Sequence, residues 1–282
     1  MENNRRFDDV IVRSHRVRGG AGADLWVDEA GDQSGRPVLF IHGISQSRLA
    51  WRRQLRSALG DNLRLVALDL RGHGDSDRPA DGYGDPDRWA DDIHAVITEL
   101  ELDEPILCGW SYGGVVIGDY LRRYGEQEIG GIVFVAAISR LGETVMPFLG
   151  ADFLATVPGL CSGDVATNTA ALDQFIRLTT SVEPRPEDWY LTLGYNGVVS
   201  PEVRQAMLSR TFTHDDTLRR LTKPVLITHG LDDRVVLPAM SDHHAALIPH
   251  AKTSHYSDVG HSPFLENPKR FNTELLAFAS AL

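Results

Sequence analysis

Short apolar runs that alternate with amphipathic segments constrain the fold of this chain more than any other feature of its sequence. The segment from Trp89 to Leu100, for example, repeats apolar residues at helical spacing. Repeated strand-helix-strand units predict a mostly parallel sheet with helices on both faces and right-handed crossovers. The runs with the length and composition of buried strands lie at residues 36–41, 63–70, 105–110, 131–136 and 224–230.

The remaining elements are predicted from the same spacing rules. Apolar residues at near-helical spacing indicate a helix over residues 46–59, another over about 112–124, and a last one over 271–282. At the start of the chain, residues 10–12 and 25–27 flank a glycine-rich segment. They predict an antiparallel hairpin that leads into the sheet.

Residues 141–210 interrupt the alternation because they contain no strand-like run. Their apolar positions predict several short helices, since a structureless loop of this length is uncommon in a compact domain. We therefore expect a core of residues 1–140 and 211–282 and a helical cap of residues 141–210 over the sheet. Some aromatic side chains of the cap could form pocket walls, although each such residue is more often part of the cap's own core. They are Phe148, Phe153, Phe175, Trp189 and Tyr190.

Charge and composition exclude several classes of partner. The chain has 28 Lys and Arg against 39 Asp and Glu, a formal net charge of -11, which opposes binding to nucleic acid. No apolar stretch approaches the ~18 residues of a membrane span, and the first ten residues lack the apolar region of a secretory signal. Cys108 and Cys161 form no Cys/His cluster, so we expect free thiols, no metal and a cytoplasmic location.

A serine lies between glycines where the third apolar run ends. The segment Gly109-Trp110-Ser111-Tyr112-Gly113 follows a predicted strand and precedes a predicted helix. Glycines let two backbones approach closely at such a turn, while a strained serine presents its hydroxyl outwards. The pattern predicts a nucleophile at Ser111 if a base, an acid and oxyanion donors converge on it.

Two backbone amides are candidate donors to an oxyanion beside Ser111. Gly43 follows the first apolar run, and a turn there would direct the amide of Ile44 at the site. The amide of Tyr112 begins a predicted helix, where unpaired N–H groups favour negative charge. His42 precedes the same turn, but a histidine in this setting is more often a structural hydrogen-bonding group than a base.

The candidate acid and base come late in the chain. Asp232 and Asp233 are adjacent carboxylates in the turn that leaves the run at 224–230. Either could orient a histidine, although turn carboxylates are commonly solvated. Of the eleven histidines, His261 alone lies in a glycine-flanked loop after these carboxylates and before the last helix.

Taken together, these motifs resemble those of the α/β-hydrolase fold family over nearly the full chain apart from the insertion. The order Ser, Asp, His along the sequence also fits that family. The resemblance implies an eight-stranded, mostly parallel sheet flanked by helices, with a helical cap inserted after the sixth strand. The segments that carry it are His42-Gly43, 69–76, 109–113, Gly230-Leu231-Asp232-Asp233 and Gly260-His261.

The resemblance also implies roles for the site residues. Ser111 is the nucleophile, His261 the general base and then acid, and Asp233 the residue that orients the imidazole. Family spacing, three positions after Gly230, favours Asp233 and leaves Asp232 as the alternative. Ile44 and Tyr112 would supply the oxyanion hole through their backbone amides, and no cofactor is implied.

A serine at this turn indicates acyl transfer, because family members that alkylate a carboxylate have an aspartate there. The layout is most similar to the serine esterase and cofactor-free haloperoxidase branch. We therefore expect a carboxylesterase that cleaves a small or medium, largely apolar ester through an acyl-serine. Carbon-carbon bond hydrolysis, lactone hydrolysis and perhydrolysis remain alternatives on the same triad, as does a ligand receptor with little turnover. The expected partner is a small-molecule substrate, and the oligomeric state is left open.

Overall fold

The computed structural model describes residues 10–282, so the prediction about a secretory signal lies almost wholly outside the described residues. Eight strands form the central sheet. They are β1 (Val12–Arg18), β2 (Asp24–Gly31), β3 (Arg36–Ile41), β4 (Leu63–Leu68), β5 (Ile106–Trp110), β6 (Gly131–Val135), β9 (Val225–Gly230) and β10 (Lys252–Tyr256).

The sheet order is β1-β2-β4-β3-β5-β6-β9-β10. β2 pairs antiparallel with β1 and with β4, and all the other neighbouring strands pair in parallel. The predicted mostly parallel, eight-stranded sheet is therefore confirmed. Its parallel strands bring their carboxyl ends to one edge, where chemistry is expected in such folds.

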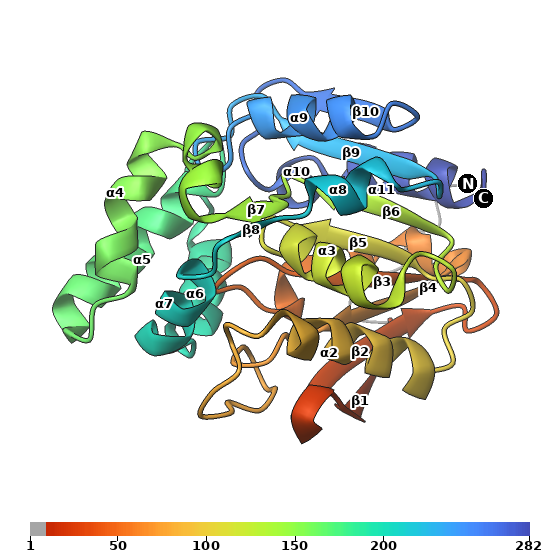
Figure 1. Cartoon of the computed structure of the whole chain (residues 1–282), viewed down its shortest axis with the longest axis horizontal. Coiled ribbons are helices and arrows are strands. Elements are labelled where there is room, and N and C mark those ends of the chain that lie inside the picture. The colour runs from red at the N-terminus through yellow and green to blue at the C-terminus, as the bar shows by residue number, and fades with distance from the viewer. Residues whose placement is uncertain (1–9) are drawn as a thin grey trace.

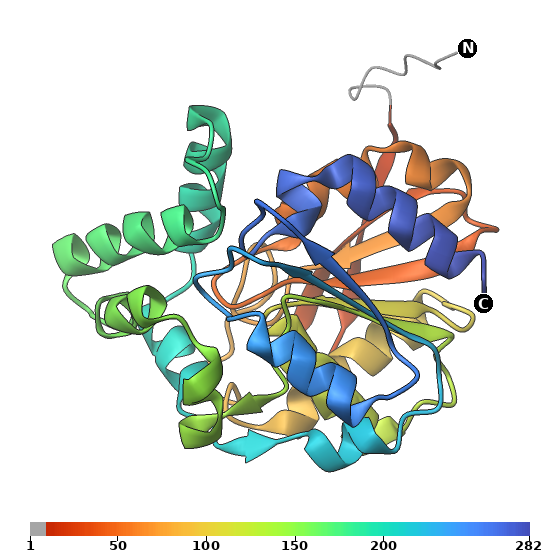
Figure 2. The same cartoon turned by 90° about the horizontal axis from the view of Figure 1, so that it is seen from above.

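Helices cover both faces of this sheet (Figures 1 and 2). One face packs against α1, α10 and α11 through a cluster that includes Trp51, Phe264 and Phe271, and the other packs against α2, α3 and α9. The helices outside the insertion are α1 (Arg52–Leu55), α2 (Pro86–Glu99), α3 (Gly113–Tyr124), α8 (Asp215–Arg219), α9 (Ala239–Leu247), α10 (Pro263–Glu266) and α11 (Pro268–Ala279).

The prediction of one helix over residues 46–59 is wrong. The segment contains two 3-10 turns, Arg48–Trp51 and Ala58–Asp61, with the single turn of α1 between them. The hydroxyls of Ser47 and Ser57 each accept a hydrogen bond from the amide two residues later, at 3.1 and 3.2 Å. Each serine is thus the N-cap of a separate 3-10 turn, and its hydrogen bond replaces one that a continuous helix would need.

The predicted hairpin at the start of the chain is present but displaced along the sequence. β1 begins at Val12 rather than covering residues 10–12, and it pairs with β2 from Val12 opposite Ala30 to Arg18 opposite Asp24. β1 is an edge strand in which Val17 alone is fully buried. Its polar composition therefore lacks the apolar pattern on which the prediction rested.

The insertion consists of four helices between the short strands β7 (Arg140–Leu141) and β8 (Phe212–Thr213), which pair with each other. A 3-10 segment, Gly142–Phe148, leads into them. We call α4–α7 the cap helices. They form a layer at the end of the sheet away from the C-terminus (Figures 1 and 2). Their bounds are α4 (Ala151–Leu160), α5 (Val165–Leu178), α6 (Pro186–Gly197) and α7 (Pro201–Leu208).

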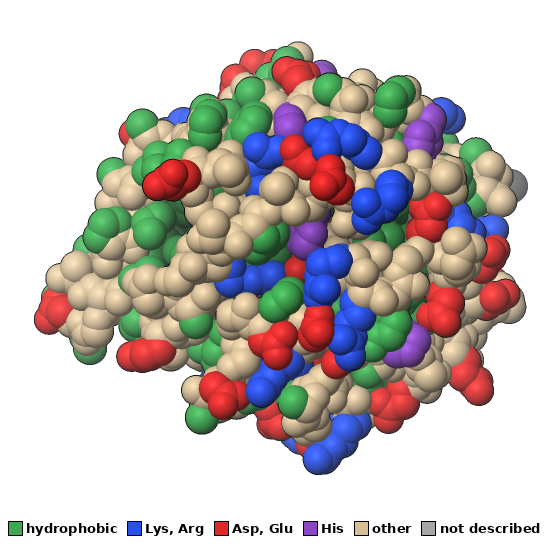
Figure 3. Space-filling view, viewed as in Figure 1, with side chains coloured by type: hydrophobic (Ala, Val, Ile, Leu, Met, Phe, Trp, Pro, Cys, Tyr) green, Lys and Arg blue, Asp and Glu red, His purple; other side chains and the backbone are tan. Residues whose placement is uncertain are grey.

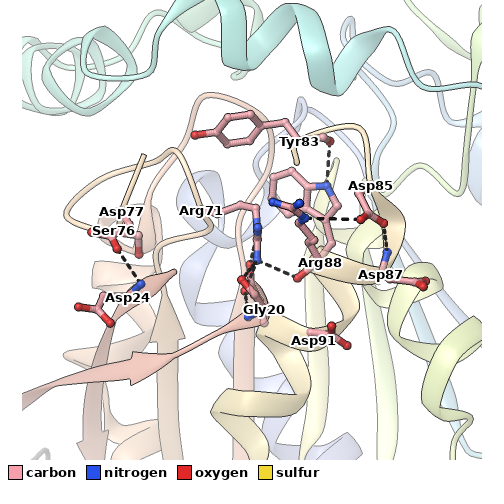
Figure 4. A network of polar contacts seen from close by, with 12 residues as sticks. Gly20, Asp24, Arg71, Ser76, Asp77, Tyr83, Asp85, Asp87, Arg88 and Asp91 are labelled. Carbon is pink, nitrogen blue, oxygen red and sulfur yellow. Dashed lines mark hydrogen bonds and ion pairs between the residues drawn. The ribbon is translucent and has the colours of Figure 1, made fainter. Parts of the chain in front are cut away.

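A buried network around an ion pair connects the turn of the first hairpin to helix α2 and to the loop after β4 (Figure 4). Arg71, in the loop after β4, and Asp92, on α2, are fully buried, and Arg71 Nε lies 2.7 Å from Asp92 Oδ2. Asp92 also accepts a hydrogen bond from the amide of Gly20 at 2.8 Å, and Arg71 donates to the carbonyl of Arg88 at 3.0 Å. Removing one partner of such a pair leaves an uncompensated buried charge, so this network fixes the loop after β4.

The surface in Figure 3 mixes acidic and basic side chains rather than forming a field of one sign. Within residues 10–282 no helix is both long and apolar enough to cross a membrane. Among residues 10–282, most of the exposed large hydrophobic side chains belong to the insertion or to the loop after β9. They are Met146, Val165, Val182, Tyr190, Val198 and Leu231, with Ile11 elsewhere.

Candidate active site

Ser111 occupies a sharp turn between β5 and α3. Its φ of 55° is in the left-handed region, which costs a non-glycine residue about 1–2 kcal/mol. The turn is held by hydrogen bonds from the Ser111 amide to the Val135 carbonyl, at 3.0 Å, and from the Ile138 amide to the Ser111 carbonyl, at 3.1 Å. A Cβ on Gly113 would lie 2.4 Å from the Ile41 carbonyl oxygen, so this position requires glycine.

The loop after β3 lies directly against Ser111. A Cβ on Gly43 would be 2.9 Å from Ser111 Cβ and 3.4 Å from its hydroxyl oxygen. The amides of Ile44 and Tyr112 make no hydrogen bond to any atom of the described part of the chain. Two free N–H groups flanking a serine are the arrangement that an oxyanion requires.

Two histidines hold this loop through neutral imidazoles. His42 Nδ1 donates to the Gly43 carbonyl at 2.8 Å, and its Nε2 accepts from the Leu70 amide at 3.0 Å. His73 Nδ1 donates to the Arg71 carbonyl at 2.9 Å, and its Nε2 accepts from the Ser45 amide at 3.2 Å. Burial lowers the pKa of His42 well below its usual range and that of His73 to about 4. Both ring nitrogens of His42 are engaged, so it is not available as a base.

Asp233 and His261 are brought together by the loops after β9 and β10. His261 Nδ1 lies 2.7 Å from Asp233 Oδ2, and both side chains are buried. Asp233 Oδ1 accepts hydrogen bonds from the amides of Val235, at 2.8 Å, and Val236, at 3.0 Å. Asp232 is exposed to solvent. The geometry therefore favours Asp233 over Asp232 as the partner of the histidine.

The Asp233 carboxylate is kept ionised by its neighbours. Burial alone would raise its pKa, but the charge of His261 and hydrogen bonds from His229 and His261 lower it to about 2. His229 Nε2 donates to the Val236 carbonyl at 2.8 Å and lies 3.1 Å from Asp233 Oδ2. An ionised carboxylate on Nδ1 fixes the tautomer of His261 and leaves Nε2 as the nitrogen free to act as a base.

Trp110 connects the serine turn to His261. Its indole N–H donates to the His261 carbonyl at 2.8 Å, and the two ring centroids are 5.5 Å apart. The described residues show no hydrogen bond between the Ser111 hydroxyl and His261 in this conformation. In ligand-free enzymes such bonds are often long and tighten when substrate binds.

A cavity of about 200 Å³ adjoins Trp110 between the sheet and the cap helices. Ile176 and Tyr195 form apolar parts of its wall, and Gln46, Arg52 and other polar side chains complete it. None of the five aromatic residues predicted as pocket walls lines this cavity. Phe153 and Phe175 are buried against each other inside the insertion, Tyr190 is exposed, and Phe148 and Trp189 pack elsewhere. Phe153 and Phe175 form part of the insertion's own core, because short helices need an apolar interior.

Sequence reasoning missed two buried arginines next to the proposed oxyanion segments. Arg204 Nε donates to the hydroxyl of Ser45 at 2.6 Å, and Arg210 Nη1 donates to the hydroxyl of Tyr112 at 3.1 Å. His73 and His229 were likewise without an assigned role. No motif or spacing marks Arg204 and Arg210, since their contacts join segments that are far apart in the sequence.

Comparisons with known proteins agree with this architecture. A family model described as alpha/beta hydrolase fold matches residues 36–268. The solved structure of the esterase RhEst1 from Rhodococcus sp. ECU1013 is similar, with a TM-score of 0.89 and 36% sequence identity over 95% of this chain and 99% of that chain.

Two relatives are named for haloperoxidase or for esterase and perhydrolase activity. The chain is 28% identical to a non-heme haloperoxidase of Rhodococcus erythropolis, over 93% of this chain and 98% of that protein. It is 26% identical to the bifunctional esterase/perhydrolase DCH of Acinetobacter calcoaceticus, over 91% of this chain and 96% of that protein. Because the family model matches residues 36–268 and the structure has the corresponding eight-stranded sheet, this chain belongs to the α/β-hydrolase fold family.

Proposed function

We propose that this chain is a serine hydrolase that cleaves a small or medium, largely apolar carboxylic ester. Ser111 is the nucleophile, His261 the general base and acid, and Asp233 the orienting carboxylate. The observation that carries the proposal is the buried contact of 2.7 Å between His261 Nδ1 and Asp233 Oδ2, set beside a serine with a φ of 55°. The similarity to an esterase of known structure supports it.

The reaction proceeds in two halves. His261 Nε2 takes the Ser111 proton as Oγ attacks the ester carbonyl, and the oxyanion is stabilised by the amides of Ile44 and Tyr112. His261 then gives the proton to the departing alkoxide, which leaves as the alcohol. Water attacks the acyl-serine, its proton passes through His261 to Ser111, and the carboxylic acid is released. Ester and water are consumed, and no cofactor enters the cycle.

Perhydrolysis is the second candidate, because one relative is named an esterase/perhydrolase. In that reaction hydrogen peroxide replaces water in the second half, and the product is a peracid. The first half is unchanged, so the same acyl-serine serves both outcomes. Lactone and carbon-carbon bond hydrolysis would use the same triad on a different carbonyl.

A substrate panel tests the proposal directly. We expect the purified full chain to hydrolyse p-nitrophenyl acetate and butyrate, with more carboxylic acid than peracid formed when hydrogen peroxide is present at millimolar concentration. Matched lactone and β-diketone substrates measure the alternatives. Turnover of the diketone with none of the esters would replace ester hydrolysis by carbon-carbon cleavage, and tight binding without turnover of any substrate would favour a receptor.

We further propose the division of the chain into a core of residues 1–140 and 211–282 and a cap of residues 141–210. The pairing of β7 with β8 supports these boundaries, because it joins the two ends of the insertion. We propose a cytoplasmic enzyme with a small-molecule substrate, since the two cysteines are unpaired.

A further inference from the structure

Arg204, on cap helix α7, is a buried cation without a carboxylate partner among residues 10–282. Its guanidinium donates instead to neutral oxygens: the Ser45 hydroxyl at 2.6 Å, the Leu160 carbonyl at 2.9 Å and the Asn196 carbonyl at 2.8 Å. Burial lowers its pKa to about 10, so it remains charged near neutral pH. An unpaired buried charge is costly to fold around, which calls for an explanation in function.

The contacts of Arg204 join the cap to the loop that carries Ile44. The Leu160 and Asn196 carbonyls are at the ends of α4 and α6, whereas Ser45 directly follows Ile44. Ser45 is itself held from the core, because its amide donates to His73 Nε2 at 3.2 Å. One side of the oxyanion segment is therefore anchored by the core and the other by the cap.

Arg210 makes the equivalent connection on the second oxyanion segment. It follows α7, and its Nη2 donates to both carboxylate oxygens of the buried Asp119 of α3, at 2.8 and 2.9 Å. Its other nitrogen donates to the Tyr112 hydroxyl at 3.1 Å. The same hydroxyl donates to the carbonyl of Met207, the penultimate residue of α7, at 3.3 Å. Tyr112 and Ser45, the residue after Ile44, are thus both hydrogen-bonded to helix α7.

We propose that Arg204 and Arg210 are positioning residues through which helix α7 sets the geometry of the oxyanion hole. The inference rests on the proposed function, because it assigns a consequence to the hole formed by Ile44 and Tyr112. Oxyanion donors act only when they are fixed where charge develops, and displacing them by about 1 Å can cost roughly 100-fold in rate.

The loop after β4 supports α7 from below. A Cβ on Gly72 would lie 3.0 Å from Val203 of α7 and 2.7 Å from the ring of Tyr83. Gly72 follows Arg71, which the buried pair with Asp92 holds in place. The helix that carries Arg204 is therefore seated on a fixed part of the core rather than on a free loop.

Ser45 offers a test that separates positioning from stability. Its φ is 62°, a strained conformation for serine that glycine adopts freely. Ser45→Ala and Ser45→Gly both remove the hydroxyl that Arg204 contacts, but only glycine relieves the strain. We expect Ser45→Gly to melt at a higher temperature than Ser45→Ala, and kcat on p-nitrophenyl butyrate to fall about 10-fold or more in both, with KM changed less than about threefold.

A double-mutant cycle shows whether Arg204 acts through Ser45. Arg204→Met should lower kcat by about 10- to 100-fold, and adding Ser45→Ala should lower it little further. Tyr112→Phe should also lower kcat with KM nearly unchanged, because it removes the hydroxyl that Arg210 contacts. Arg177→Met, at an exposed arginine of cap helix α5, is the matched control and should keep wild-type kcat.

The inference is overturned if kcat follows melting temperature across the Ser45 variants, or if the Arg204 and Ser45 losses multiply. It is also overturned if Ser45→Ala and Tyr112→Phe both leave kcat unchanged. These results differ from failure of the proposed function, in which the wild-type chain itself would not turn over esters. If Arg204→Met does not fold, the Ser45 and Tyr112 variants still decide the question, since each removes only one buried hydroxyl.

Discussion

Ser111→Ala is expected to lower kcat for aryl ester hydrolysis by about 10⁴-fold or more while the protein remains folded. The change removes one oxygen from a side chain that makes no hydrogen bond within the described structure, so the free energy of unfolding should change little. Alanine keeps the strained φ of 55° at this turn. Steady-state kinetics on p-nitrophenyl butyrate, together with a thermal melt, measure both quantities.

A second serine close by provides the control for this result. Ser139 is also buried, but its hydroxyl pairs with His244 Nε2 at 2.9 Å rather than facing the oxyanion loop. Ser139→Ala should therefore keep kcat within a few-fold of wild type. If Ser111→Ala retained its rate, the acyl-serine cycle would be excluded.

Asp233→Asn is expected to lower kcat by about 10⁴-fold, and Asp232→Asn by less than about threefold. Asparagine can offer an N–H to His261 Nδ1, which favours the tautomer with the proton on Nε2 and removes the base. Asp232 is exposed and is not bonded to the histidine, so its replacement leaves that arrangement intact. The pair differs by one position in sequence and has identical chemistry, which makes it a matched comparison.

The outcome for the two aspartates is read from kcat/KM across pH 5–9. A large loss in Asp233→Asn with normal Asp232→Asn agrees with the proposed triad. The opposite ranking would transfer the orienting role to Asp232, and small losses in both would show that His261 works without a carboxylate partner.

The sequence predicts the interior of the fold well because buried parallel strands are made of nearly continuous apolar residues. β3, β5 and β6 are buried along most or all of their length, and each lies where an apolar run predicts it. The edge strands are harder to predict from sequence. β10, with the sequence KTSHY, is largely polar, and β1 has a single fully buried side chain. Their register comes from backbone pairing with a neighbour, which composition does not encode.

The same contrast holds at the candidate site. Ser111, Asp233 and His261 follow glycine turns at strand ends, so motif and order are enough to nominate them. Arg204 and Arg210 belong to no motif, and the roles proposed for them depend on how the cap helices pack onto the core. Which cap aromatics line a pocket stays open at the sequence level for the same reason, since spacing identifies an apolar face but not whether it meets a cavity or another helix.

We propose that Ser111, His261 and the amides of Ile44 and Tyr112 converge on one carbonyl group of the substrate. A crystal structure of the full chain after reaction with a p-nitrophenyl alkylphosphonate tests it most directly. We predict phosphorus bonded to Ser111 Oγ, a phosphoryl oxygen about 2.7–3.1 Å from both amides, and His261 Nε2 within hydrogen-bonding distance of the adduct. An adduct on another residue, or one on Ser111 whose phosphoryl oxygen points away from both amides, would contradict the account.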